Sequence, residues 1–149
     1  NLVSLAEERG TKVIFVTKQQ TIPLGQSSLT VFPPVGKGDP NEQGLTYLCS
    51  SGSFDLLITG DMSGQTEADL VKRYAIPDVE VLLVGHHGSK YSSQSEFLSA
   101  ISPEAAIISV GDNSYGHPTD AAISRLKAAG AEIYRTDDQC CITVTVHKH

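Results

Sequence analysis

The sequence has no apolar run long enough to cross a membrane, and it is poor in cysteine and in positive charge. A membrane-spanning helix needs about 20 consecutive apolar residues, so none is expected here. Residues 1–10 contain no basic leader followed by an apolar core, so no signal peptide is expected either. The 149 residues, 40% hydrophobic and 19% charged, suit one ordinary globular domain over residues 1–149.

Only three cysteines occur, Cys49, Cys140 and Cys141, and no CxxC or Cys/His finger spacing is present. This scarcity excludes the usual zinc fingers and disulfide frameworks. We expect the cysteines to be small strand residues of a reduced protein, with a redox or intermolecular role as the alternative.

The chain also lacks an excess of basic residues, since its net charge is -6 and its pI is about 5.2. Affinity for duplex DNA comes mainly from neutralised phosphates, so an acidic chain is a poor candidate for holding a duplex by itself. An enzyme that handles a phosphodiester at a metal is not excluded, because the metal supplies positive charge. Lys90 and Arg135 are candidates for basic residues that lie near such a metal site.

The order of apolar patterns predicts strands first and strand–helix alternation afterwards. The early part is expected to hold a helix ending at Gly10, a strand over 12–16, an edge-like segment over 21–25, and strands over 28–32, 45–49 and 54–58. The later part is expected to hold a helix capped by Ser63, a strand over 79–84, a helix opened by a capping box at 93–96, an internal strand over 105–110, a helix with Pro118 at its first position, and strands over 132–134 and 141–146. This order predicts a mixed α/β sheet with helices on at least one face.

Polar side chains follow two of the apolar runs. Asp61 comes directly after residues 56–60, and the pair His86-His87 follows residues 79–85. Ligands and metals collect just past the carboxyl ends of strands in α/β sheets, and a preceding glycine lets the backbone turn sharply. A carboxylate beside two imidazoles is metal-ligand chemistry.

Each of these residues also has a purely structural explanation. An Asp after a Gly is common in turns. Two adjacent histidines at a strand end are harder to explain as buried core groups, because each ring has two nitrogens that need partners. His117 lies between Gly116 and Pro118 at a helix start, where a lone surface histidine is also common.

Taken together, these segments resemble the second half of the metallo-β-lactamase fold. More narrowly, they resemble the C-terminal hydrolase-like domain of the ComEC family, the membrane channel proteins of bacterial competence. The matching pieces are TIPLG, LTVFPP, the Asn41 loop, LLITGD, VLLVGHHGSKYSS, EFLSAISPEAAIISVGDNSYGHP and RLKAAGAEIYRTDD with ITV. They agree in order and spacing from about Gln20 to Val146.

The resemblance implies roles for individual residues. Asp61 matches the Asp that bridges two metals, and the His-His pair matches the motif that provides the last metal ligand. We expect His87 to be this ligand and His86 to face substrate, with the reverse order left open. His117 matches the family's GHP histidine, an acid/base or phosphate-contact residue. The residues expected to line the same mouth are Ser89, Asn113 and Tyr115.

The chain departs from this pattern in its first half. The HxHxDH signature that supplies most of the metal ligands is missing, and no histidine precedes His86. In the family, the segment that corresponds to residues 41–44 is an Asn-rich stretch that ends in Ser, and Gly44 departs from this pattern. We therefore expect the C-terminal part of a metallo-β-lactamase-like αββα sandwich whose first half is absent. Such folds consist of two similar halves packed sheet to sheet, so a lone half would expose an apolar face and form a homodimer.

For the intact domain, the resemblance implies a site of two Zn²⁺ or Mn²⁺ ions that hydrolyses DNA phosphodiesters. It also implies that DNA and a membrane channel of the same polypeptide are partners, and that this is a soluble domain of a bacterial plasma-membrane protein. One Asp and one or two His are too few ligands for tight metal binding, so this chain is expected to be weak or inactive. The alternatives are another hydrolase of the superfamily, such as a phosphorylcholine esterase-like enzyme, and a non-catalytic domain associated with a channel.

Overall fold

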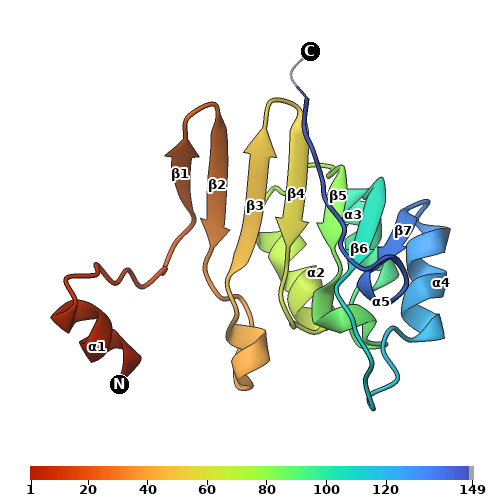
Figure 1. Ribbon diagram of the computed structural model, residues 1–149, viewed down its shortest axis with the longest axis horizontal. Coiled ribbons are helices and arrows are strands. Elements are labelled where there is room, and N and C mark those ends of the chain that lie inside the picture. Colours follow the sequence, from red (N-terminus) through yellow and green to blue (C-terminus); the bar gives the residue numbers. More distant parts are fainter. Residues whose placement is uncertain (148–149) are drawn as a thin grey trace.

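A seven-stranded mixed sheet forms the centre of the computed structural model, which describes residues 1–147 (Figure 1). The strands lie side by side in sequence order. The first four pair antiparallel and the last four pair parallel. This confirms the predicted mixed α/β sheet. The strands are β1 (Gln20–Leu24), β2 (Ser27–Phe32), β3 (Thr46–Ser51), β4 (Phe54–Ile58), β5 (Val81–Leu83), β6 (Ala105–Ile108) and β7 (Glu132–Arg135).

Three helices connect the parallel strands, because neighbouring parallel strands need a crossover between them. These helices are α2 (Gly64–Arg73), α3 (Ser95–Ile101) and α4 (Asp120–Ala128). All three pack against one face of the sheet through a shared apolar core. Its main members are Leu57, Leu82, Ala106 and Ile108 from the sheet and Leu70, Phe97, Leu98, Ile101 and Leu126 from the helices. Each buried Leu, Ile or Phe stabilises the fold by about 1.5–3 kcal/mol.

The opposite face of the sheet is also apolar. Directly paired residues project to the same side, so the strand register defines rows of side chains across this face. One row joins Ile22, Leu29, Cys49, Leu56, Val81 and Ala105, and the next joins Tyr47, Ile58, Leu83, Ile107 and Tyr134. Residues 142–145 lie over β5 to β7 and enclose with them a cavity of about 320 Å³ (Figure 1). At the β1 edge of the same face, Ile22 and Leu24 are exposed.

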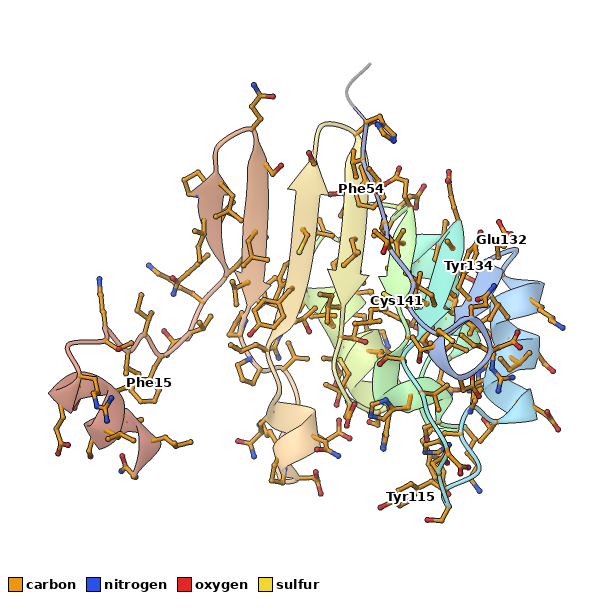
Figure 2. The ribbon with its side chains drawn as sticks, viewed as in Figure 1. Phe15, Phe54, Tyr115, Glu132, Tyr134 and Cys141 are labelled. Carbon is orange, nitrogen blue, oxygen red and sulfur yellow. The ribbon has the colours of Figure 1, made fainter. Side chains whose placement is uncertain are left out.

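The predicted strand over residues 12–16 is not formed. α1 (Leu2–Glu8) precedes an irregular segment that reaches β1, and this whole region has no buried apolar side chain. Phe15 is 74% exposed and lies away from the sheet (Figure 2). The reason is that β1 pairs only with β2, so residues 12–16 have no neighbouring strand in the described chain. No helix within residues 1–147 combines the length and the hydropathy that a bilayer span requires.

Three other local predictions are wrong. Residues 141–146 form no strand, because the short helix α5 (Thr136–Gln139) turns the chain across the sheet instead of along its β7 edge. α3 has Gln94 as its N-cap and lacks the predicted capping box, because the N–H of Ser93 donates to Glu67 instead. The first helical position of α4 is Asp120 rather than Pro118, because Thr119 is the N-cap and its hydroxyl accepts from the N–H of Ala122.

The residues predicted to form the site gather at one edge of the sheet. β2 and β4 are both antiparallel to β3, and β4 to β7 are parallel, so β2 and β4 to β7 all end at this edge. It lies at the bottom of Figure 1. It carries two short helical turns, η1 (Pro40–Gln43) after β2 and η2 (Gly85–Gly88) after β5.

Candidate functional site

Asp61 and His87 meet where β4 and β5 end. The N–H of His86 donates to the carbonyl of Gly60 at 3.0 Å and so joins the two strand ends. His87 Nδ1 lies 2.7 Å from the carbonyl oxygen of Ser109, which can only accept, so Nδ1 carries the proton. The other ring nitrogen, Nε2, lies 3.9 Å from Asp61 Oδ1. A backbone carbonyl that accepts from one imidazole nitrogen and leaves the other free as a ligand is typical of metal-ligating histidines.

The backbone of the histidine pair is strained. His86 and His87 both have left-handed conformations, with φ of 50° and 53°. This region costs a non-glycine residue about 1–2 kcal/mol. The following Gly88 is fixed from α4, because the N–H and hydroxyl of Thr119 both donate to its carbonyl, at 2.9 and 3.1 Å. Strain of this kind concentrates at functional sites, where the surrounding structure maintains it.

His117 extends the site toward the loop after β6. Its ring stands edge-on to that of His86, with 5.8 Å between centroids and 74° between planes. Burial of the ring, aided by the nearby His86 and His87, lowers the pKa of His117 below its usual value. A neutral imidazole can accept a proton or a hydrogen bond, and Nδ1 of His117 is buried with no hydrogen-bond partner among the described residues.

Asn113 shapes the loop that carries His117. Its amide nitrogen donates to the carbonyls of Gly111 and His117, at 2.9 and 2.8 Å. Its amide oxygen accepts from the N–H groups of Tyr115 and His117, both at 3.1 Å. The side chain therefore makes its hydrogen bonds within the loop and braces it.

The other two residues predicted at the mouth differ sharply in position. Ser89 is 2% exposed, and its hydroxyl accepts from the N–H of Tyr91 inside the loop. Tyr115 is exposed at the tip of the loop after β6, at the bottom of Figure 2. The structure thus brings Asp61, His86, His87, His117 and Tyr115 to one accessible edge and places Ser89 beneath it.

Two hollows flank the histidine pair. The hollow on the His87 side measures about 350 Å³, and its walls include Ser109, Gly111, Asn113, Tyr115, His117 and Thr136. The hollow on the His86 side measures about 450 Å³, and its walls include Asp39, Asn41, Glu42, Asp61, Ser63 and Tyr91. The two adjacent histidines therefore serve different hollows.

The sequence did not predict that the carboxylate of Glu42 supports the start of α2. It accepts from the N–H and the hydroxyl of Ser63, at 3.2 and 3.1 Å, and from the hydroxyl of Thr66. A carboxylate at a helix N-terminus complements the helix dipole. Glu42 reaches this edge because η1 follows β2, whose direction depends on its pairing with β3 rather than on a local sequence pattern.

A second unpredicted carboxylate, Glu67, lies fully buried beneath the histidine loop. Its Oε2 accepts from the N–H of Ser93 at 2.7 Å, and its Oε1 has no hydrogen-bond partner among the described residues. Burial raises the pKa of Glu67 to about 7. Arg125 of α4 holds the same loop from the other side, by donating to the carbonyls of Lys90, Ser92 and Ser93.

The donor set does not fit a complete metal centre. Asp61 and His87 provide one carboxylate and one imidazole nitrogen, 3.9 Å apart. Within residues 1–147, however, no group of three or more His, Cys, Asp or Glu side chains is arranged to hold a metal ion. Protein metal sites usually need at least three protein ligands.

Comparison with known proteins identifies related sequences. The chain is 42% identical over 101 residues to the competence protein ComA of Neisseria gonorrhoeae, an alignment that covers 66% of the chain and 15% of the relative. The chain is a relative of the ComEC family of competence proteins. It is also 29% identical over 140 residues to ComE operon protein 3 of Bacillus subtilis, which covers 91% of the chain and 18% of the relative. The chain therefore spans less than a fifth of the length of either protein.

Among solved structures, the chain is similar to CmlA, a diiron β-hydroxylase from Streptomyces venezuelae, with a TM-score of 0.62. The two share 14% identity, and the match covers 92% of this chain and 36% of CmlA. At this identity the likeness shows the fold alone, which is that of the metallo-β-lactamase proteins. No model of a known protein family matches the chain. The predicted family resemblance and fold are thus confirmed, and the roles of individual residues stay predictions.

Proposed function

We propose that this chain is one domain, the C-terminal part of a metallo-β-lactamase-like domain in a DNA-uptake protein, and that its polar edge is half of a phosphodiesterase site. The pairing of Asp61 with His87 Nε2, with His87 Nδ1 fixed by Ser109, carries the proposal. The competence relatives support a role in DNA uptake. In the parent, the domain would lie beside a channel in the bacterial plasma membrane, with DNA as its partner.

Asp61 and His87 would be two of the ligands of a Zn²⁺ or Mn²⁺ centre, and the remaining donors would come from outside this chain. Such ions activate water for hydrolysis. The rings of His86 and His117 meet edge-on beside these ligands, with 5.8 Å between their centroids, which suits contact with a phosphodiester. Asn113 would hold His117 and Tyr115 in place. The chain alone would then bind metal weakly and have little or no hydrolase activity.

Zinc binding by calorimetry tests this proposal. The chain is expected to bind one Zn²⁺ weakly, and the Asp61→Ala/His87→Ala variant is expected to bind it at least tenfold more weakly, because both ligands are lost. Manganese would be titrated in parallel. A Glu7→Ala/His147→Ala variant is the matched control, because it removes one carboxylate and one imidazole from exposed positions elsewhere.

Two outcomes would contradict the proposal. Equal zinc affinity in the Asp61→Ala/His87→Ala variant would mean that the metal binds elsewhere. Cleavage of DNA by the isolated chain, lost in that variant, would mean that the donors within the chain suffice after all.

The incomplete donor set also favours a second candidate, a non-catalytic domain associated with the channel. The two functions differ in one result. If the domain is non-catalytic, Asp61→Ala and His87→Ala in the full-length parent protein should leave DNA uptake intact.

A further inference from the structure

Two tyrosines stand in solvent on opposite sides of the histidine pair. Tyr115 is 81% exposed and borders the hollow on the His87 side. Tyr91 is 65% exposed and borders the hollow that contains Asp61 and His86. Single exposed aromatic side chains are ordinary on a protein surface. Two that flank one polar centre, however, define an axis that runs across this centre.

Both rings are presented by braced backbone. The N–H of Tyr115 donates to Asn113, as described above, and the carbonyl of Tyr91 accepts from the N–H of Gly64 at 2.7 Å. Arg125 holds the carbonyls of the residues on either side of Tyr91, Lys90 and Ser92. Neither ring contributes to the apolar core, so the fold has no packing use for them. Binding residues are typically exposed side chains on loops that a rigid scaffold positions.

Each tyrosine ring contacts a neighbouring side chain near the histidine pair. Tyr115 stacks on His117 with 6.1 Å between centroids and 22° between planes, and His117 in turn meets His86. On the other side, Lys90 Nζ lies 4.9 Å from the centre of the Tyr91 ring. An exposed aromatic ring with an ammonium group over one of its faces suits a nucleobase and its phosphate.

The charges of the site favour a single strand over a duplex. The net charge is -6, and Asp39 and Asp112 line the two hollows, so phosphate neutralisation alone would bind DNA poorly. Stacking does not need a basic surface, and it is available only to bases that are not already stacked within a duplex. An unpaired strand can therefore bind where a duplex is repelled.

We propose that Tyr91 and Tyr115 form a two-point stacking platform for unpaired bases of single-stranded DNA, with the intervening backbone lying across Asp61 and His86. This inference rests on the proposed function for the identity of the strand, and it adds the residues that hold the strand in position. Tyr91 and Tyr115 would determine strand preference rather than carry out chemistry.

Fluorescence anisotropy with a labelled oligothymidine of about 15 nucleotides tests the platform. Tyr91→Leu and Tyr115→Leu are each expected to weaken binding by roughly tenfold, because one base–aromatic stack is lost. Tyr91→Phe and Tyr115→Phe keep the ring and should bind as the unaltered chain does. Phe15→Leu is the matched control, because it removes an exposed ring that lies away from the site. Circular dichroism would verify that every variant is folded.

Other probes and variants make the result decisive. A duplex and an abasic strand of the same length are expected to bind at least tenfold more weakly than the oligothymidine. Equal binding of the abasic strand, equal binding of the duplex, unchanged affinity in both Leu variants, or no binding of the oligothymidine at low salt would each overturn the platform. Tyr91→Leu and Tyr115→Leu are expected to lose oligothymidine affinity and to keep the zinc affinity of the unaltered chain, because neither ring is a proposed metal ligand. Failure of the metal proposal and failure of the platform therefore give different results.

Discussion

At the residue scale, the left-handed backbone conformation of His86 lowers the stability of the fold at a residue of the proposed site. His86→Gly is expected to increase the free energy of unfolding by about 0.5–1 kcal/mol, because glycine adopts a φ of 50° without the Cβ penalty. Urea denaturation measures this change. Gln94→Gly, at a φ of -73°, is the control and should decrease stability. A destabilised His86→Gly variant would show that the loop is not strained.

At the same scale, Glu67 makes the stability of the fold depend on pH. Burial raises its pKa from 4.5 to about 7, so the folded state holds the proton more tightly than the unfolded state does. The resulting stabilisation is fully present below about pH 4.5 and is lost as the pH rises through 7. A neutral glutamine does not titrate and has no such dependence.

Glu67→Gln is therefore expected to stabilise the fold at about pH 8, by on the order of 2–3 kcal/mol, and to have little effect near pH 4.5. Urea denaturation across this pH range provides the measurement. Glu96→Gln replaces an exposed glutamate on α3 and should change little at any pH. A constant difference between Glu67→Gln and the unaltered chain at all pH values would mean that Glu67 does not titrate as described.

At the element scale, the patterns that predicted correctly were those whose elements have a partner within the chain. Residues 28–32 and 54–58 became strands because each finds neighbours in the sheet. Residues 12–16 are at least as apolar, but no neighbouring strand reaches them among the described residues. Residues 141–146 cross a sheet face instead of joining its edge. Local propensity does not encode the presence of a partner strand, which is a tertiary property.

The site shows the same limit. Asp61, His86 and His117 could be grouped from the sequence because each follows a strand of the parallel half of the sheet. The contributions of Glu42 and Tyr91 could not be predicted in this way, because they depend on the direction of β2 and on the course of a loop held by α4. The bracing bonds of Asn113 depend on backbone geometry that no sequence pattern shows.

At the scale of the whole molecule, the sheet has two apolar faces and only one layer of core helices. Burial against α2, α3 and α4 accounts for one face. On the other, residues 142–145 lie over β5 to β7, and the row from Ile22 through Leu29 to Cys49 continues beyond them on β1 to β3. Apolar patches of this extent usually mark an interface.

We therefore expect the isolated chain to form a homodimer through this face, with a second copy covering the rows that the helices leave open. Light scattering over a range of concentrations should give the mass of a dimer. Leu29→Lys introduces a charge at the centre of the uncovered row and should shift the mass to that of a monomer, because an unpaired charge at an interface is costly. Ala100→Lys, on the exposed side of α3, adds the same charge elsewhere and should leave the dimer intact. A monomer at high concentration, or a dimer unaffected by Leu29→Lys, would place any association on a different surface.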